Sequence, residues 1–476
     1  MPELMRLTSF VGAAVLPHDG AAISLVRPGD GKAVFAVVEA NDEVVDAAAK
    51  SARHAFEVNR SASLHQRSEW LRAASAVLKE ESKRVATFIS EDIGKPIRVA
   101  QIEVRRGVEF LDACAAAALN IGGEVVPVDA AANGVNHFGF TRRVPYGVVG
   151  AITPFNAPVN LLIQKVAPAI AAGNAVVVKP APSGTRVALV LAEAFCKHGW
   201  PPGLFNVVTG DRAAAMAIAK NPTVSAVSFT GGTAAGEALA QAAGIKKFVA
   251  ELGSNAANIV MADADVVDAA RKIAGAAFEA SGQQCISAQR VLVEEPVLDR
   301  FVEEFVAAAA KLCVGPADDP SADLGPMVHR AAADRVMRMC QDAIDRGARF
   351  ALQPKQESCI VSPAILLDVP DAADLWQHEV FGPVALVRSF NDIEEGIRLA
   401  NDSPFGLQGA VFTSSLATAM RFSADFDVGS LWVNEASRYR LDMYPFGGMK
   451  QSGTGREGVR YAIEELSQIK FTGIKL

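Results

Sequence analysis

The sequence predicts an α/β protein built on two mainly parallel sheets. Between residues 146 and 262, short apolar stretches typical of strands, such as VVGAI, AVVVKP and AVSFTG, alternate with helical stretches such as 159–172 and 185–198. The same alternation returns between 254 and 452. Because alternating strands and helices favour parallel sheets, whose ligands bind at the carboxyl ends of the strands, we expect two α/β units with a Rossmann-like ligand site in the first.

Composition and charge limit the function classes. The chain has 476 residues, of which 50% are hydrophobic and 21% charged, so it can bury large cores. A net charge of −7 argues against a nucleic-acid partner, which usually requires a basic face. No apolar run reaches the length of a membrane span, and MPELMRLTSF does not resemble a signal peptide, so we expect a cytoplasmic protein without a membrane partner.

Cysteine and histidine spacing gives no sign of a metal site. The six cysteines are scattered without a CxxC pair, and the seven histidines form no cluster with ligand spacing. We therefore expect no catalytic metal and mostly reduced, buried cysteines.

The first 150 residues combine helices with a few short strands. An extended pair is expected within 23–40, around the turn Pro28-Gly29-Asp30-Gly31. Amphipathic helices follow at 42–59, after an Asn41-Asp42 cap, at 65–90 and at 97–120. The alternating stretches after residue 124 predict a protruding hairpin that turns at Asn133-Gly134.

The second half predicts another α/β unit and a terminal strand. Helices are expected at 264–281, 296–312, 329–346, 391–401 and 415–425, and strands at 289–294, 359–366, 383–389 and 409–413. The final stretch QIKFTGIKL alternates like a strand and would need a partner strand, which another subunit could supply.

A cysteine with an unusual set of companions marks the predicted chemistry. Cys285 follows Gly282-Gln283-Gln284, the acid Glu251 lies upstream in a Glu-Leu-Gly turn, and Asn156 follows Pro154-Phe155. A thiolate can attack a carbonyl, an amide can hold the oxyanion that forms, and a carboxylate can then activate water. This combination predicts covalent catalysis at a carbonyl.

Local motifs indicate a nucleotide site less clearly than they indicate the cysteine chemistry. The chain has no GxGxxG fingerprint, and Gly231-Gly232 is not followed by the Lys-Ser/Thr of a P-loop. What remains is a strand, SAVSFTGG, followed by a helix whose amino end could face a phosphate.

Six ordered stretches together resemble the aldehyde dehydrogenase superfamily: TPFNAPVNLLIQKVAPAIAAGNAVVVKPA, SFTGGTAAG, ELGSNAANIV, SGQQCIS, EVFGPV and YPFGGMKQSGTGREG. The resemblance covers essentially the whole chain. It implies a cofactor-binding domain at 1–123 and 144–253, a catalytic domain at 254–452, and an oligomerisation element at 124–143 and 453–476. It also implies a homodimer or homotetramer.

The resemblance assigns roles to individual residues. Cys285 matches the nucleophile, Glu251 the general base for deacylation and Asn156 the oxyanion donor, while Lys165 matches a lysine near the nucleophile. The implied reaction is NAD(P)-dependent oxidation of an aldehyde to the carboxylic acid, through a cysteine thiohemiacetal and a thioester.

The cofactor residues follow in the same way. Lys179 matches the lysine at the adenosine ribose, and Glu379 with Phe381 the pair at the nicotinamide ribose and ring. The stretches Thr153-Pro154 and Phe229-Thr230-Gly231-Gly232 match the segments beside the pyrophosphate and nicotinamide.

Pro182 departs from the pattern of NAD-specific relatives, which commonly have a glutamate there that repels a 2′-phosphate. Without that acid, NADP is not excluded, and Ser183, Thr185 or Arg186 could meet the phosphate. The sequence leaves NAD and NADP open.

The substrate prediction depends on polar positions along the family's aldehyde tunnel. Arg106 and Arg440 are candidates to bind an anionic tail, and the resemblance extends to relatives that act on phosphonoacetaldehyde, lactaldehyde and glyceraldehyde 3-phosphate. Gln284 lies before the nucleophile, where several anion-selective members have arginine. We therefore expect a short aldehyde with a phosphonate, sulfonate, phosphate or carboxylate tail.

Two other readings of the chemistry stay open. One is oxidation of aromatic or aliphatic aldehydes such as benzaldehyde, and the other is an acylating enzyme that transfers the acyl group to coenzyme A. The presence of Glu251 favours water over coenzyme A as the acyl acceptor.

Overall fold

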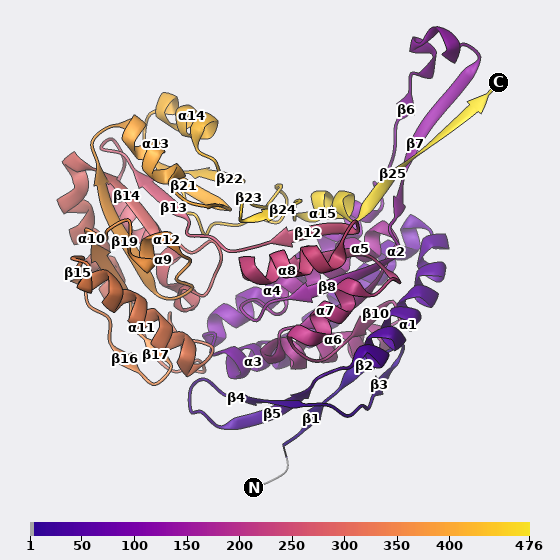
Figure 1. The fold of residues 1–476 in the computed structure, drawn as a ribbon, viewed down its shortest axis with the longest axis horizontal. Coiled ribbons are helices and arrows are strands. Elements are labelled where there is room, and N and C mark those ends of the chain that lie inside the picture. The colour runs from indigo at the N-terminus through magenta and orange to yellow at the C-terminus, as the bar shows by residue number, and fades with distance from the viewer. Residues whose placement is uncertain (1–3) are drawn as a thin grey trace.

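The computed structural model describes residues 4–476. It contains two α/β units side by side and a narrow three-stranded arm that projects from the first unit (Figure 1). Among the described residues, no helix is both long and apolar enough to cross a membrane. The α/β class predicted from the alternation of strands and helices is confirmed.

The first unit is built on an eight-stranded sheet with the order β24-β12-β11-β8-β9-β10-β2-β3. Its strands are β2 (Ser9–Val11), β3 (Ala14–Leu16), β8 (Val148–Thr153), β9 (Ala175–Pro180), β10 (Phe205–Val207), β11 (Val224–Thr230), β12 (Lys247–Glu251) and β24 (Gly453–Thr454). The five strands from β12 to β10 are parallel. Strands β8 and β9 are buried along their whole length, which is why they read as continuous apolar runs.

Nine helices of the described chain accompany this sheet: α1 (Asp42–Ser61), α2 (Leu64–Glu80), α3 (Ser82–Ile93), α4 (Ile97–Ala118), α5 (Asn160–Ala172), α6 (Thr185–Lys197), α7 (Arg212–Lys220), α8 (Thr233–Ala243) and α15 (Val459–Glu465). The predicted cap of α1 is present, because Asn41 Oδ1 accepts a hydrogen bond from Val44 N at 3.0 Å. The single helix expected at 65–90 is instead two helices that meet at Glu81.

The second unit has a seven-stranded sheet with the order β15-β18-β19-β14-β13-β21-β22. Its strands are β13 (Ala257–Val260), β14 (Arg290–Glu294), β15 (Arg349–Leu352), β18 (Ala364–Leu367), β19 (Val384–Phe390), β21 (Gln408–Phe412) and β22 (Ser430–Val433). Its helices are α9 (Val266–Phe278), α10 (Leu298–Ala310), α11 (Arg330–Asp345), α12 (Asp374–Gln377), α13 (Ile393–Asn401) and α14 (Leu416–Asp425).

Alternate residues of this second sheet enter two different cores. Ile259 and Leu292 belong to one cluster, whereas Val260 and Val291 belong to the other. Since successive strand residues point to opposite faces, both faces of the sheet are covered. The strand expected at 359–366 is broken into β17 (Ile360–Val361), which pairs with β16 (Gln356–Glu357), and β18. Pro363 lies at the break and has no N–H to donate.

Short strands complete the two units. β1 (Arg6–Leu7), β5 (Ala33–Val38) and β4 (Ala22–Val26) form a three-stranded sheet beneath the first unit, so the extended pair expected within 23–40 is present. β20 (Phe405–Gly406) pairs with β23 (Met449–Lys450) between the two units.

The arm consists of β6 (Val125–Val126), β7 (His137–Pro145) and β25 (Ser467–Lys475), with β7 in the centre. The expectation of a tight turn at Asn133-Gly134 is wrong. The connection is a longer loop with two 3-10 segments, Val128–Ala130 and Ala132–Gly134, and the positive φ lies at Asn136 instead. An Asn-Gly pair favours a two-residue turn only when strand pairing brings the flanking residues opposite each other, and here β6 ends too early.

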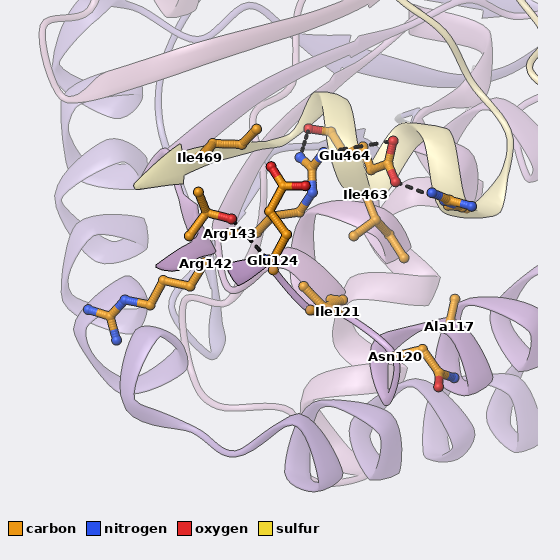
Figure 2. Close-up of a pocket in the computed structure, with 13 residues that line it drawn as sticks. Ala117, Asn120, Ile121, Glu124, Arg142, Arg143, Ile463, Glu464 and Ile469 are labelled. Atoms are coloured by element: carbon orange, nitrogen blue, oxygen red, sulfur yellow. Dashed lines mark hydrogen bonds and ion pairs between the residues drawn. The ribbon is translucent and has the colours of Figure 1, made fainter. Parts of the chain in front are cut away.

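The base of the arm contacts the first unit around a cavity of about 610 Å³ (Figure 2). Arg143 donates to the Glu464 carbonyl at 3.0 Å and to Ser467 Oγ at 3.2 Å. Residues 453–466 lie with the first unit, because β24 pairs with β12 and Val459 packs in the core of that unit. We retain the three-part domain division as a proposal and place the start of the arm's second segment at Ser467.

Candidate active site

A crevice opens in the first sheet where the direction of the chain reverses. From β8 the chain moves on to β9 and β10, and from β11 it moves the opposite way to β12. Ligands of open parallel sheets bind at such switch points, beyond the carboxyl ends of the strands. A cavity of about 390 Å³ lies there, lined by seven of the predicted cofactor residues: Thr153, Pro154, Lys179, Phe229, Thr230, Gly231 and Gly232.

The geometry of this cavity fits a pyrophosphate. Helix α8 starts directly after Gly232, and no side chain caps its first turn. A Cβ on Gly231 would lie 2.5 Å from the Phe229 ring, whereas the space beside Gly232 is open. The buried Thr230 Oγ1 has no hydrogen-bond partner among residues 4–476. Free N–H groups at a helix amino end attract anions, so this turn can hold the phosphates of a dinucleotide.

Lys179 also lines this cavity and is only 5% exposed. Burial lowers the pKa of Lys179, and the nearby carboxylates of Asp211 and Glu39 offset part of that shift. Arg186, one of the residues expected to meet a 2′-phosphate, is instead paired with Asp92 and with Glu91 at 2.8 Å. The expectation for Arg186 is therefore wrong, because two acids of α3 already hold its guanidinium.

Glu379 and Phe381 come from the second unit and reach toward α8. Glu379 Oε1 accepts a hydrogen bond from Ser254 N at 3.1 Å, and burial raises the pKa of Glu379 to about 8. A Cβ on Gly253 would lie 3.0 Å from Glu379 Oε2 and 3.2 Å from Thr233 Oγ1, so only glycine leaves this gap open. The Phe381 ring meets the Phe155 ring edge-on at 5.9 Å.

Strained backbone leads into Cys285. Ala280, Ser281 and Gly282 all have positive φ, of 52°, 58° and 64°. A Cβ on Gly282 would lie 2.1 Å from the carbonyl oxygen of Gly382, so no other residue fits. Such strain persists only where surrounding contacts hold it, and here Ser281 Oγ donates to the Gly325 carbonyl at 2.7 Å.

Asn156 and Cys285 line the same cavity, of about 90 Å³. Asn156 Nδ2 donates one N–H to the Gln283 carbonyl at 2.9 Å. Lys95 Nζ, itself paired with Glu103, donates to the Asn156 carbonyl at 2.5 Å. The side-chain amide of Asn156 is thereby held beside the thiol with a second N–H that can reach an oxyanion.

Glu251 ends β12 and is only 2% exposed. Neither of its carboxylate oxygens has a hydrogen-bond partner among residues 4–476. Burial, followed by the negative charge of Glu457, raises the pKa of Glu251 well above its usual value.

Glu457, a residue that the sequence analysis did not single out, is the buried partner of two cations. Its carboxylate accepts from Lys165 Nζ at 2.9 Å and from Arg440 Nη2 at 2.9 Å. Burial alone would raise the pKa of Glu457, but Lys165 and Arg440 together hold it below its usual value. A lysine inside the apolar helix NLLIQKVAPAIAA signals that some acid must pair with it, although the sequence does not say which.

The thiol of Cys285 is held in its neutral form. Burial raises the pKa of Cys285 to about 12; Arg440 opposes this shift, whereas Glu379, Glu251 and Glu457 add to it. These acidic and basic groups therefore lie close enough to the cysteine to act on its ionisation.

The cavity beside Cys285 also contains Arg106, Gln284 and Arg440, as predicted. Arg106 pairs with Asp442 at 3.1 Å, and Arg440 donates to Gln164 Oε1 at 3.0 Å as well as to Glu457. A third arginine, Arg438, lines the cavity too, donates to Gln284 Oε1 at 2.8 Å and pairs with Glu279. The signal for Arg438 is a second arginine two residues before Arg440, in the same RYRLD stretch that was expected to supply an arginine to the tunnel.

The sequence matches the aldehyde dehydrogenase family over residues 15–472. It is 39% identical over 438 residues to the 3-sulfolactaldehyde dehydrogenase of Priestia aryabhattai, which covers 92% of this chain and 91% of that protein. The structure is similar to that of the NADP-dependent glyceraldehyde-3-phosphate dehydrogenase of Bacillus halodurans C-125 complexed with NADP, with a TM-score of 0.96 and 31% identity over 99% of this chain and 100% of the other. It is also similar to an NAD-dependent aldehyde dehydrogenase of Sinorhizobium meliloti, with a TM-score of 0.94 and 31% identity over 100% of this chain and 95% of the other.

The high pKa of Cys285 predicts slow alkylation of the cofactor-free protein. Below pH 9, labelling of Cys285 by iodoacetamide should rise about tenfold per pH unit, because only the thiolate reacts. Replacing Glu457 by Gln removes a charge that raises the pKa of Cys285 and should accelerate labelling at pH 8 by about threefold or more. Peptide mass spectrometry after timed labelling measures both rates.

The matched control for this experiment is Glu464→Gln, an equal change of charge on α15 whose carboxylate pairs with Arg460 at 2.8 Å. It should leave the labelling rate of Cys285 unchanged. Thermal unfolding of each variant checks that the fold is intact, and a rate in Glu457→Gln equal to or below that of the wild type would contradict the assignment.

Proposed function

The chain belongs to the aldehyde dehydrogenase family, and from its site geometry we propose that it oxidises a short aldehyde with an anionic tail to the carboxylic acid. It is an NAD(P)-dependent enzyme. The observation that carries the proposed chemistry is the placement of Cys285 and Asn156 on one small cavity, with Glu251 close enough for its charge to raise the pKa of the thiol.

Cys285 is the proposed nucleophile. Its thiol loses a proton, and the sulfur forms a bond to the aldehyde carbon while the carbonyl oxygen takes up negative charge. The free N–H of the Asn156 amide and the backbone N–H of Cys285 are the proposed donors to that oxygen. Burial and the nearby acids Glu379, Glu251 and Glu457 favour the neutral thiol, and the positive charge of Arg440 is the influence that favours loss of this proton.

Thr153, Pro154, Lys179, the 229–232 turn, Glu379 and Phe381 are the proposed residues that hold NAD or NADP. When bound, the nicotinamide supplies the hydride acceptor that turns the thiohemiacetal into a thioester. The side chains lie on both units, so the cofactor would be held between the first sheet and the 379–381 segment.

Glu251 is the proposed base for hydrolysis of the thioester. Neither of its oxygens has a hydrogen-bond partner in the described part of the chain, which leaves them available to a water molecule. Because the pKa of Glu251 is raised, only part of the enzyme molecules have an ionised Glu251 that can accept a proton. Deacylation should therefore accelerate as the pH rises toward that pKa. Lys165 is proposed to act through Glu457, which it holds ionised.

The anionic tail is the proposed ligand of the three arginines. Arg106, Arg438 and Arg440 are each paired with an acid, but a guanidinium has five N–H donors, and the Arg106 pair uses a single nitrogen. No aromatic side chain lines this cavity within the described chain, which does not favour a benzaldehyde-like substrate. The similarity to a sulfolactaldehyde dehydrogenase supports a tail with a sulfonate or a related anion.

We also propose that the arm joins subunits into a homodimer or homotetramer. Among residues 4–476, strand β25 pairs only with β7 and forms the edge of its sheet, so within the described chain no other strand pairs with its second row of N–H and C=O groups. It exposes Ile469 at 65% and Phe471 at 50%. Long, apolar edge strands usually recruit another chain.

Replacing Glu251 by Gln should stop the reaction after acylation. Mixing this variant with aldehyde and cofactor should release about one NAD(P)H per active site in a burst, followed by turnover about a hundredfold or more below the wild type. Stopped-flow absorbance at the NAD(P)H band measures the burst. Cys285→Ala should give neither burst nor turnover, and wild-type turnover in Glu251→Gln would refute the assigned role.

Replacing Arg106 by Ala should raise KM about tenfold or more for sulfoacetaldehyde or phosphonoacetaldehyde while changing KM for propanal less than about twofold. The reason is that propanal has no charge to bind. Arg105→Ala is the matched control, because Arg105 is exposed on the same helix and does not line the cavity. An equal rise in KM for the anionic aldehyde and for propanal in Arg106→Ala would refute the proposal that Arg106 binds an anionic tail.

Replacing Ile469 and Phe471 together by Lys should dissociate the assembly into single chains, because two charges would then lie along the edge of β25. Light scattering coupled to gel filtration measures the mass. Val267→Lys, which changes an apolar residue exposed at 44% on α9, should leave the mass unchanged. A wild type that runs as a single chain would contradict the proposed assembly.

A further inference from the structure

An acid lies beside the predicted ribose lysine, at a position where the sequence suggested none. Asp211 Oδ1 is 4.0 Å from Lys179 Nζ, and among residues 4–476 it is the one carboxylate within ion-pair distance of this buried ammonium. Both residues line the 390 Å³ cavity. The side chain of Asp211 is 63% exposed, so its carboxylate faces the open part of that cavity.

The backbone around Asp211 is held rigidly. Glu39, which follows β5, accepts hydrogen bonds from Asp211 N at 2.7 Å and from Ala214 N at 3.0 Å, and so caps the amino end of α7. Gly210 has a φ of 132°, and a Cβ there would lie 2.9 Å from the Glu39 carboxyl carbon. Gly210 and the half-buried cap Glu39 therefore fix the position of Asp211 next to Lys179.

We infer that Asp211 is the residue that makes this enzyme prefer NAD to NADP. This inference rests on the proposed function, in which the cavity binds the cofactor with Lys179 at the adenosine ribose. NADP differs from NAD by a phosphate on that ribose, which carries nearly two negative charges at neutral pH. The Asp211 carboxylate repels this phosphate and also neutralises part of the positive charge of Lys179, which weakens the binding of NADP. In NAD, the free ribose hydroxyl can instead donate a hydrogen bond to the Asp211 carboxylate.

The neighbouring residues offer one competing influence. Arg186 is held by Glu91 and Asp92 and does not line the cavity. Arg212, in contrast, lines the cavity, is exposed, and follows Asp211 directly. Its guanidinium would attract the extra phosphate. The preference for NAD follows because the Asp211 carboxylate lies within 4.0 Å of Lys179, the lysine proposed to hold the ribose that carries the extra phosphate in NADP.

Titrations with reduced cofactors test this inference without turnover. The dissociation constants of NADH and NADPH are measured by nucleotide fluorescence for the wild type, Asp211→Asn, Asp211→Ser and Arg212→Gln. The wild type should bind NADH at least about tenfold more tightly than NADPH, and both Asp211 variants should tighten NADPH by about tenfold while changing NADH less than about threefold.

The matched control is Glu237→Gln. Glu237 is exposed on α8, does not line the cavity, and its replacement changes the net charge by the same amount. It should leave both dissociation constants unchanged. This comparison separates a local effect of Asp211 from a general effect of protein charge.

Each other outcome has a defined meaning. Tighter binding of NADPH than NADH by the wild type, with a loss of that preference in Arg212→Gln, would overturn the inference in favour of Arg212. Unchanged NADPH binding in both Asp211 variants would also overturn it. Failure of the wild type to bind either nucleotide would instead contradict the proposed cofactor site itself.

Discussion

The buried carboxylate of Glu457 is the interaction on which the active site depends. It joins α5, through Lys165, to the 440 segment, through Arg440, and it belongs to the stretch that leads into α15. All three side chains are nearly inaccessible to water, at 9% exposure or less. A buried charge is tolerated only when it is paired, so removing any one of the three leaves an uncompensated charge in the interior.

The same charges set the chemistry of the groups around them. Glu457 raises the pKa of Glu251 and of Cys285, while Arg440 lowers both. Arg440 therefore has a structural and electrostatic role in addition to lining the substrate cavity. Arg438, which extends from the same segment, donates a hydrogen bond to Gln284 and lines the same cavity as Arg440.

Two glycines lie where distant segments of the site approach each other closely. Gly282 touches the carbonyl of Gly382, which links the strained turn before Cys285 to the segment that carries Glu379 and Phe381. Gly253 leaves a gap between Glu379 and the start of α8. Cys285 and the proposed nicotinamide site are thus held by segments that pack against each other, so a change in one segment should shift the other.

Much of this protein was predictable from its sequence. Hydrophobic periodicity located most helices and strands, because buried parallel strands and amphipathic helices have distinct apolar patterns. The motif set indicated the family, and in the structure Cys285 and Asn156 line one cavity while seven of the expected cofactor residues line another. The roles of these residues stay proposals. The sequence could not show the loop that replaces the expected turn at Asn133-Gly134, because that loop depends on where the pairing of β6 ends.

Only the tertiary structure decided which charges meet. Lys165 and Glu457 are 292 positions apart, Arg106 and Asp442 are 336 apart, and no local pattern links them. The sequence shows proline at 182, where NAD-specific relatives commonly have an acid. The acid beside Lys179 is instead Asp211, which lies in the loop after β10. The reaction class could be inferred from the sequence, because each of the motifs that indicate it is a short contiguous stretch of the chain. Charge pairing was decided by the fold, because burial forces each ion to find a partner wherever the packed chain supplies one.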